Sequence, residues 1–368
     1  MIWNLIYRTV RMGMEFSYHV YVRSFQINQT YKEKRIDHVI YVANHGNAFF
    51  DAFSIIYSQQ KIPVFLTRAG VFKSKIGGYI LRKLFMLPIY RQRDGIKSVS
   101  KNNEIMSKCV EYLNNGRHPV GMFPEGNHNM KLGLRPLQKG ISRMAFEALD
   151  KYPDMDLKII PIGINYSSYM SFKADVFVNK GEPLFIKPFY EIYKENKIEG
   201  TQALMTELKE SMSELSLSIP NENYDEIYQQ FEKVRSRGSD LKMNFEKDKE
   251  IIKGLINGES YPETIYAKQN NSLLWIRRIF ALPLYLIGLI SNFFPELILK
   301  KMVKKTVSDP HFHDSIAVSI GFFLYSIMYL LQAVLLYFIT GNAAIAIIYL
   351  ILIPFISKLY YAYLYRKQ

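Results

Sequence analysis

Short apolar runs alternate with helix-periodic runs over residues 36–190 of this 368-residue chain. The apolar runs are rich in β-branched and aromatic residues and occupy residues 36–43, 63–67, 87–91, 119–123, 157–166 and 175–179. Helical character lies between them, at residues 52–60, 72–85, 98–114 and 142–149. This alternation predicts an α/β domain over residues 36–190, with helices on both faces of a sheet. Because ligand crevices of such sheets lie at strand ends, polar residues there are the first candidates for a site.

The pattern changes after this domain. Residues 191–265 are charged and helix-favouring, with leucines at helical spacing, and they predict a helical region without obvious chemistry. Residues 266–368 read as a membrane region. Two apolar stretches within it, at about 316–338 and 343–362, are long enough to cross a hydrocarbon core of ~30 Å. A short turn joins them, so the sequence predicts a C-terminal transmembrane hairpin.

Two other segments suggest membrane contact. The apolar segment 279–295 is short and contains Pro283, so we expect it to be interfacial or re-entrant. Residues 1–35 predict an amphipathic, membrane-associated helical region, because apolar residues recur four apart and charged residues break any signal-like run. An ordinary helix packed on the domain fits residues 1–35 equally well.

The charge of the chain indicates an anionic partner. The formal net charge is +14, which favours nucleic acid, a phosphate-rich substrate or an anionic membrane face. Residues 266–368 contain ten basic and three acidic residues, so much of this charge has a membrane explanation and nucleic acid is not expected. The turn between the two apolar stretches has no charge. The positive-inside rule therefore places both ends of the hairpin, and the preceding domain, in the cytoplasm.

Two features of the composition bear on the compartment. The single cysteine, Cys109, excludes an internal disulfide and a thiolate metal cluster. The richness in Lys, Asn, Ile and Tyr is typical of an AT-rich genome and favours a bacterial inner membrane. We therefore expect a membrane protein whose catalytic domain lies on the cytoplasmic face.

A histidine and an aspartate flank the first predicted strand-to-helix junction. His45 follows the strand, where a loop exposes it, and Asp51 stands near the start of the next helix. A carboxylate at this place can hydrogen-bond one imidazole nitrogen, so that the other nitrogen can take a proton. The alternative is a helix-start acid beside an ordinary loop histidine.

A second group of residues follows another predicted strand, in the sequence Phe123-Pro124-Glu125-Gly126. Glu125 offers an acceptor suited to an alcohol hydroxyl, and Gly126 permits a positive φ or close approach of a substrate. Taken alone, this is a turn with a surface glutamate. Together with His45 and Asp51 it indicates an enzyme, because both groups stand at strand ends.

Two further features lie on predicted strands. Arg91 ends the run that begins at Leu87 and can hold a phosphate through two hydrogen bonds, although a solvated surface arginine is the alternative. Pro161 interrupts the apolar run of residues 157–166, which favours an edge strand or a lipid-facing wall over plain core.

In this order, the residues resemble the four motifs of the glycerol-phosphate acyltransferase superfamily, which includes 1-acylglycerol-3-phosphate acyltransferases. The resemblance covers about residues 38–190 and rests on Asn44-His45 with Asp51, Pro88 to Arg91, Phe123 to Gly126, and Ile160 to Ile162. It implies a mixed sheet flanked by helices. The helical region and the membrane hairpin lie outside it.

The chain departs from the family pattern at two places. Five residues separate His45 from Asp51, where four are usual. This longer spacing resembles the branch of fungal glycerol-3-phosphate and dihydroxyacetone-phosphate acyltransferases. Asn127 and His128 follow Gly126, where Thr or Ser and then a basic residue are usual. The first departure bears on the identity of the acceptor.

The resemblance implies direct acyl transfer without an acyl-enzyme, with acyl-CoA or acyl-carrier protein as co-substrate and no other cofactor or metal. His45 would be the general base, oriented by Asp51. The other implied site residues are Arg91, Glu125, Gly126 and Lys139 for the glycerol phosphate, and Pro161 for the acyl-donor region. The acceptors left open are lysophosphatidic acid, glycerol 3-phosphate and another lysolipid.

Two other classes of protein compete with this interpretation. His311-Phe312-His313-Asp314 superficially suggests a metallohydrolase, but no second cluster of ligands accompanies it. A non-catalytic membrane scaffold is favoured by the long apolar tail alone. The presence of His45, Asp51 and Glu125 at strand ends favours the enzyme.

Overall fold

The computed structural model describes residues 2–90, 100–169, 172–262, 274–306 and 312–364. It divides into two compact units, which we call the sheet unit and the helical unit. The sheet unit comprises Met1–Tyr7, Gln26–Tyr166 and Val176–Thr264; the helical unit comprises Arg8–Phe25, Ser167–Asp175 and Ile265–Gln368. The expected helical region of residues 191–265 therefore folds with the α/β domain.

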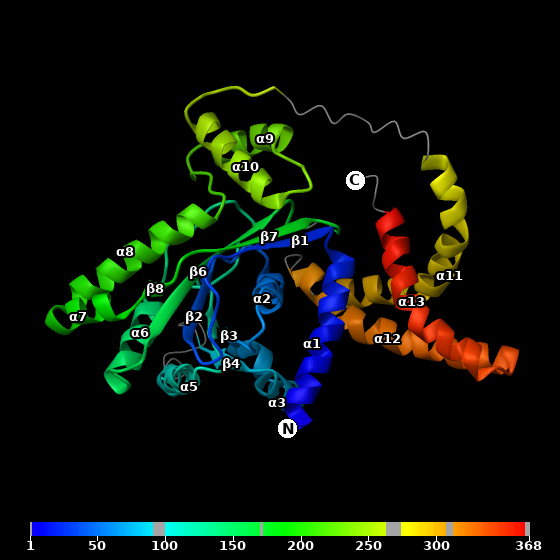
Figure 1. Ribbon diagram of the computed structural model, residues 1–368, viewed down its shortest axis with the longest axis horizontal. Coiled ribbons are helices and arrows are strands. Elements are labelled where there is room, and N and C mark those ends of the chain that lie inside the picture. The colour runs from blue at the N-terminus through cyan, green and yellow to red at the C-terminus, as the bar shows by residue number, and fades with distance from the viewer. Residues whose placement is uncertain (1, 91–99, 170–171, 263–273, 307–311, 365–368) are drawn as a thin grey trace. The chain divides into compact units, whose positions relative to one another are not determined.

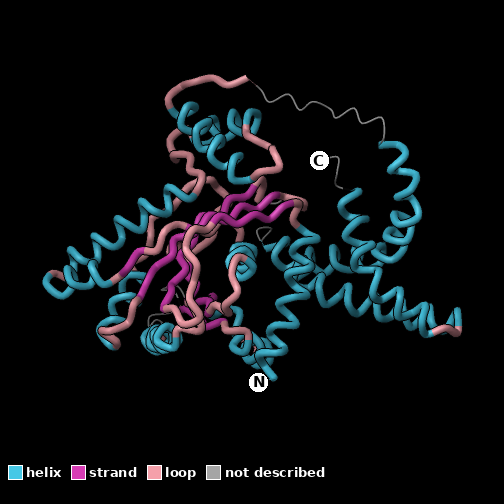
Figure 2. Tube along the Cα trace, in the orientation of Figure 1, coloured by secondary structure: helices cyan, strands magenta, loops and turns pink. Residues whose placement is uncertain are grey.

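A single mixed sheet forms the centre of the first unit (Figure 2). Its strands are β1 (Ser24–Asn28), β2 (His38–Ala43), β3 (Val64–Arg68), β4 (Met86–Ile89), β5 (Val120–Met122), β6 (Leu157–Tyr166), β7 (Asp175–Lys180) and β8 (Leu184–Phe185). The order is β1-β7-β6-β2-β5-β3-β4, and β8 pairs with β6. Strands β2 to β6 pair in parallel, whereas β7 and β8 run antiparallel to β6. The expected mixed sheet is confirmed.

The apolar runs of the sequence became strands β2 to β7, but β1 was missed. Its residues, Ser-Phe-Gln-Ile-Asn, lie within the predicted N-terminal helical region. The alternation of polar and apolar residues in β1 suits an edge strand. It is only five residues long, and it directly follows helix α1 (Ile2–Tyr21), so the helix period hid it.

Helices cover both faces of the sheet (Figure 1). On one face, α5 (Asn102–Asn115), α6 (Gly140–Lys151) and α8 (Lys197–Leu215) pack against β2, β5 and β6 in the main hydrophobic core. On the other face lies α2 (Ala48–Tyr57). The remaining helices of the unit are η1 (Ala69–Phe72), α3 (Lys75–Lys83), α7 (Lys187–Glu195), α9 (Tyr224–Val234) and α10 (Leu241–Ile256). This core fixes β2 and β5, whose ends carry the candidate site.

The expectation of an edge position for Pro161 is wrong. Strand β6 lies inside the sheet, with β2 on one side and β7 and β8 on the other, and Pro161 pairs with Val42. A proline is tolerated there because β8 pairs only as far as Ile159 and β7 begins to pair at Ile162. Pro161 therefore falls at the interruption between two partner strands, where no ladder N–H is required of it.

The helical unit contains three helices that are long and apolar enough to cross a membrane. They belong to α11 (Leu274–Thr306), α12 (His313–Thr340) and α13 (Ala343–Leu364). The last two are the helices of the predicted hairpin, and their turn ends α12 at Gly341 with a φ of 62°. Residues Arg8–Tyr21 of α1 belong to the same unit, and the Phe16 ring lies 6.0 Å from that of Phe355 on α13. This part therefore packs with the candidate membrane helices, and its expected association with a membrane stays a prediction.

The expectation of a short interfacial segment at 279–295 is wrong. Helix α11 continues through Pro283 and Pro295, and its apolar part, Leu282–Lys305, is long enough to span. The sequence interpretation stopped at Phe294, although only one acid interrupts the apolar run before Lys300. If all three candidate helices span a membrane, the two ends of α11, which both carry basic residues, lie on opposite faces. Charge alone therefore no longer assigns the orientation.

Candidate active site

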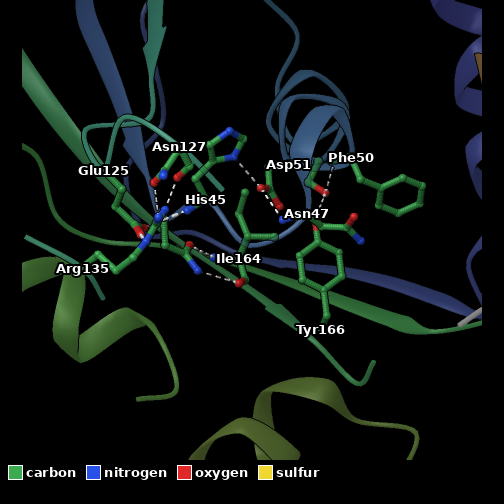
Figure 3. A network of polar contacts seen from close by, with 11 residues as sticks. His45, Asn47, Phe50, Asp51, Glu125, Asn127, Arg135, Ile164 and Tyr166 are labelled. Carbon is green, nitrogen blue, oxygen red and sulfur yellow. Dashed lines mark hydrogen bonds and ion pairs between the residues drawn. The ribbon is translucent and has the colours of Figure 1, made fainter. Parts of the chain in front are cut away.

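His45 and Asp51 meet at the carboxyl end of β2, as the sequence predicted. His45 stands two residues after the strand, and Asp51 lies in the first turn of α2. The Nδ1 atom of His45 lies 2.8 Å from Oδ2 of Asp51 (Figure 3). The imidazole also stacks on the Phe123 ring, with centroids 4.3 Å apart. With Nδ1 engaged by the carboxylate, Nε2 is the nitrogen that can take a proton.

Asp51 is fully buried and accepts hydrogen bonds from three donors. Besides His45, the backbone N–H of Asn47 donates to Oδ2 at 2.8 Å, and the hydroxyl of Tyr166 donates to Oδ1 at 2.7 Å. These three donors fix the position of the carboxylate against the imidazole.

The loop that carries His45 is attached to the neighbouring strand β6. The Asn44 side chain both donates to the carbonyl oxygen of Ile164, at 3.0 Å, and accepts from its N–H, at 2.7 Å. Ala48, the first residue of α2, has a φ of 45°, which an L-residue other than glycine rarely adopts. The positive φ lies within the five-residue spacing between His45 and Asp51, so the longer spacing is accommodated there.

Glu125 does not present a free oxygen as expected. Its side chain is only 2% exposed, and both oxygens face protein donors. Oε1 accepts the backbone N–H of His45 at 2.9 Å, and Oε2 accepts from Nε of Arg135 at 2.5 Å. Arg135 also hydrogen-bonds the side chain and the carbonyl oxygen of Asn127 (Figure 3). The carboxylate therefore holds the His45 loop, and its expected contact with a substrate hydroxyl stays a prediction.

The rest of the turn lies as expected. Gly126 has a φ of 78°, which is the positive value that the sequence suggested. The backbone N–H of Gln138 donates to the carbonyl oxygen of Pro124 at 2.8 Å, which brings the exposed Lys139 close to the turn. An exposed cation at this place can meet an anionic substrate.

Two expected features are not tested by this geometry. Arg91 lies outside the residues that the structure describes. Pro161 lies on β6 next to the site strand β2, but no contact assigns it to an acyl donor. Within the described ranges, no group of three or more His, Cys, Asp or Glu side chains can hold a metal ion. His311, the first residue of the His311-Phe312-His313-Asp314 cluster that suggested a metallohydrolase, lies outside those ranges.

Comparisons with known proteins cover the same part of the chain. The family model described as Acyltransferase matches residues 25–165, which include the residues of the network around His45 except Tyr166. Glycerol-3-phosphate O-acyltransferase 1 of Saccharomyces cerevisiae is 31% identical over 110 residues, and glycerol-3-phosphate O-acyltransferase 2 of the same yeast is 25% identical over 202 residues. Through this region the chain is similar to the glycerol-phosphate acyltransferase superfamily.

The matched parts are small fractions of these relatives. The match to the first yeast enzyme covers 29% of this chain and 14% of that enzyme. The match to the second covers 46% of this chain and 26% of that enzyme. An uncharacterized acyltransferase of Schizosaccharomyces pombe is 30% identical over 28% of this chain and 15% of its own length. Among solved structures, the 1-acyl-sn-glycerophosphate acyltransferase of Thermotoga maritima is similar, with 16% identity, a TM-score of 0.42, and coverage of 58% of this chain and 80% of that one.

Three residues of the candidate site were given too little weight from the sequence alone. Tyr166 ends β6, beside the site strand, and its position at a strand end was a usable signal. Asn44 was seen only as part of a motif. Arg135 lies in an irregular segment ten residues after Glu125, and nothing in the sequence indicates that it folds back onto the turn.

Proposed function

We propose that this membrane-bound acyltransferase transfers a fatty acyl group from acyl-CoA or acyl-carrier protein to a hydroxyl of a glycerol phosphate, in phospholipid synthesis. The observation that carries the proposal is the contact between His45 and the buried Asp51 at the carboxyl end of β2. The two yeast relatives, which are named glycerol-3-phosphate O-acyltransferases, and the longer spacing between His45 and Asp51 both favour glycerol 3-phosphate as the acceptor. Lysophosphatidic acid and another lysolipid are the alternatives.

The chemistry needs one base and no covalent enzyme intermediate. Nε2 of His45 takes the proton of the acceptor hydroxyl as its oxygen attacks the thioester carbonyl. The resulting imidazolium is stabilised by the Asp51 carboxylate. When the tetrahedral intermediate collapses, the carbon–sulfur bond breaks and the thiolate takes the proton back from His45. An ester and a free thiol are the products.

Other residues have supporting roles in this proposal. Lys139 and Arg91 supply positive charge for the acceptor phosphate. Arg135 positions the turn through Glu125 and Asn127, and so holds the backbone of the His45 loop. Pro161 and its strand line the acyl-donor region. The location at a bacterial inner membrane, with the sheet unit facing the cytoplasm, stays a prediction.

The test is acyl transfer from labelled palmitoyl-CoA by the detergent-purified full chain, with glycerol 3-phosphate and lysophosphatidic acid offered in parallel. We expect His45→Ala to lower turnover at least about 10²-fold, the lower range for general bases. His128→Ala is the matched control, because its ring lies 5.8 Å from that of His45 but the proposed mechanism gives it no proton to take. Equal losses in the two variants would contradict the role of His45.

The role of Arg135 has its own readout. Arg135→Lys retains the charge but cannot span Glu125 and Asn127 together, so we expect a fall in kcat with little change in the KM for the acceptor. A change in KM alone would show that Arg135 binds the acceptor instead. If the wild type forms no product with CoA or carrier-protein donors on any acceptor offered, the scaffold interpretation replaces the enzyme.

A further inference from the structure

The helical unit encloses a cavity of about 620 Å³ that the acyl-transfer chemistry does not use. Four helices line it: the Arg8–Tyr21 part of α1, the end of α11, the first half of α12 and the end of α13. Most of the lining side chains are apolar or aromatic, among them Phe16, Val303, Val318, Phe322 and Phe355. Ligand sites typically have volumes of about 300–1,000 Å³ and walls of this kind.

The character of the walls decides what can fill the cavity. An apolar cavity of ~150 Å³ stays dry and accepts benzene, so water is a poor occupant here too. The cavity of about 620 Å³ has about four times the volume of that benzene-binding cavity, which suits one hydrocarbon chain with a polar end. Helices α11, α12 and α13, which line the cavity, are candidate membrane spans. In a membrane, lipid acyl chains would therefore surround the cavity.

One side of the cavity is polar and already ordered. The Tyr329 hydroxyl donates to the buried Asn292 at 2.6 Å and lies 2.7 Å from the hydroxyl of Ser357. Closer to the basic end of α11, the hydroxyls of Tyr325 and Tyr361 lie 2.6 Å apart. Interhelical hydrogen bonds of this kind hold membrane helices together. They give the cavity hydroxyl groups in fixed positions next to apolar walls.

The rim carries Lys300 and Lys304 beside Glu296 and Asp314, and Lys304 is the cation placed to meet an anionic head group. Both acids there are engaged: Glu296 accepts from Lys300 at 2.5 Å and from Tyr361, and Asp314 accepts from the Tyr21 hydroxyl. Lys304 lines the same rim and is exposed, and among the described residues it forms no ion pair. It lies at the end of the apolar span Leu282–Lys305, which is the depth at which lipid phosphates lie.

We propose that this cavity is a binding site for one membrane glycerophospholipid, with an acyl chain between α1, α12 and α13 and the phosphate at Lys304. The site is separate from the residues that carry acyl transfer, and the proposal does not depend on the acceptor. Two sources of phosphate are possible in principle, a lipid and free phosphate. The apolar volume favours the lipid.

Lys304 and Lys305 provide a matched pair of variants. Both are exposed lysines at the end of α11, but only Lys304 lines the cavity. A general attraction of anionic lipid to the basic helix end would be weakened equally by either change to glutamate. A phosphate bound at the cavity predicts that Lys304→Glu lowers the affinity about tenfold, as expected for loss of a charged hydrogen bond, while Lys305→Glu has little effect.

The experiment is native mass spectrometry of the detergent-purified full chain with added dioleoyl phosphatidylglycerol. Its head group is not that of the proposed acceptors, so binding does not report on the catalytic site. Dioleoylglycerol, which lacks the phosphate, and inorganic phosphate, which lacks the chains, are the companion probes. We expect a 1:1 adduct with the phospholipid, a weaker one with dioleoylglycerol and none with phosphate. Equal adducts with both lipids, or binding of phosphate alone, would overturn the assignment.

Filling the cavity gives an independent check. Ala317→Phe places a ring inside it, whereas Ile327→Phe adds a similar ring to an exposed position on the same helix that does not line it. We expect only the first variant to lose the adduct. If that variant fails to fold, Ser326→Trp at the exposed rim asks the same question. Retention of the adduct in a folded cavity-filling variant, or equal effects of Lys304→Glu and Lys305→Glu, would show that lipid binds elsewhere.

Discussion

Changing Asp51 to asparagine removes one charge from the site and little else. The carboxylate atom Oδ2 accepts two N–H groups, from His45 and from the backbone of Asn47. The amide NH₂ of an asparagine cannot face two donors, so its oxygen takes this position. The NH₂ group then faces Tyr166, whose hydroxyl can turn to accept. We therefore expect Asp51→Asn to keep the orientation and tautomer of His45.

The magnitude follows from the charge that is lost. In the transition state the imidazolium of His45 lies against the Asp51 carboxylate, with the two nearest atoms 2.8 Å apart. Charges ~4 Å apart attract by about 4 kcal/mol at an effective dielectric constant of ~20. The side chains are only 16% and 0% exposed, so water screens the pair weakly. Since each ~1.36 kcal/mol is a factor of ten in rate, kcat should fall about 10³-fold.

The assay is steady-state acyl transfer at saturating donor and acceptor, with thermal unfolding measured beside it. Tyr166→Phe is the control, because it removes a neutral donor from the same carboxylate while leaving its charge. We expect this control to lose far less activity than Asp51→Asn. A fall of less than about tenfold in a folded Asp51→Asn protein would refute the ion-pair reasoning. A loss clearly larger than about 10³-fold would show that the orientation of His45, and not only the charge, had been lost.

Three further predictions concern stability and reactivity in the sheet unit. Burial alone would raise the pKa of Asp37, but hydrogen bonds, chiefly from Lys158, lower the pKa below its usual value. The pair of Asp37 and Lys158 therefore stabilises the fold fully above about pH 4, and this stabilisation is lost as the pH falls through the pKa of the folded state. In urea unfolding, Lys158→Met should lower the free energy of unfolding by about 3–5 kcal/mol at pH 7 and by clearly less in acid. A decrease that does not vary with pH would contradict this role of the pair. Burial raises the pKa of Cys109 to about 12, so a thiol reagent at pH 8 should label it only after unfolding, and rapid labelling of the native protein would show an open core. Gly163→Ala would place a Cβ 1.9 Å from a backbone carbonyl oxygen at the end of α8 and should lower Tm sharply, whereas Gly70→Ala, which meets nothing within 4 Å, should not.

The sequence was most informative where one pattern repeated over many residues. Strands β2 to β7 and the helices between them follow from runs of apolar residues with two distinct periods, because burial on a sheet or a helix requires those periods. The two apolar helices α12 and α13 follow from length alone. Helix α11 is longer than the expected interfacial segment, because that expectation rested on a short apolar run and on Pro283, through which the helix continues.

At the site, the sequence determined the residue types and the tertiary structure decided what each one does. His45 and Asp51 are six residues apart, so a local turn suffices to join them, and their contact was predictable. Glu125, Arg135 and Tyr166 reach this turn from other parts of the chain, and only the packing of β6 and the segment after β5 brings them there. That packing buried the Glu125 carboxylate, which the sequence alone presents as an ordinary surface acid. Long-range contacts leave no periodic trace in a sequence, because they depend on how the elements pack and not on the order of residues within any one of them.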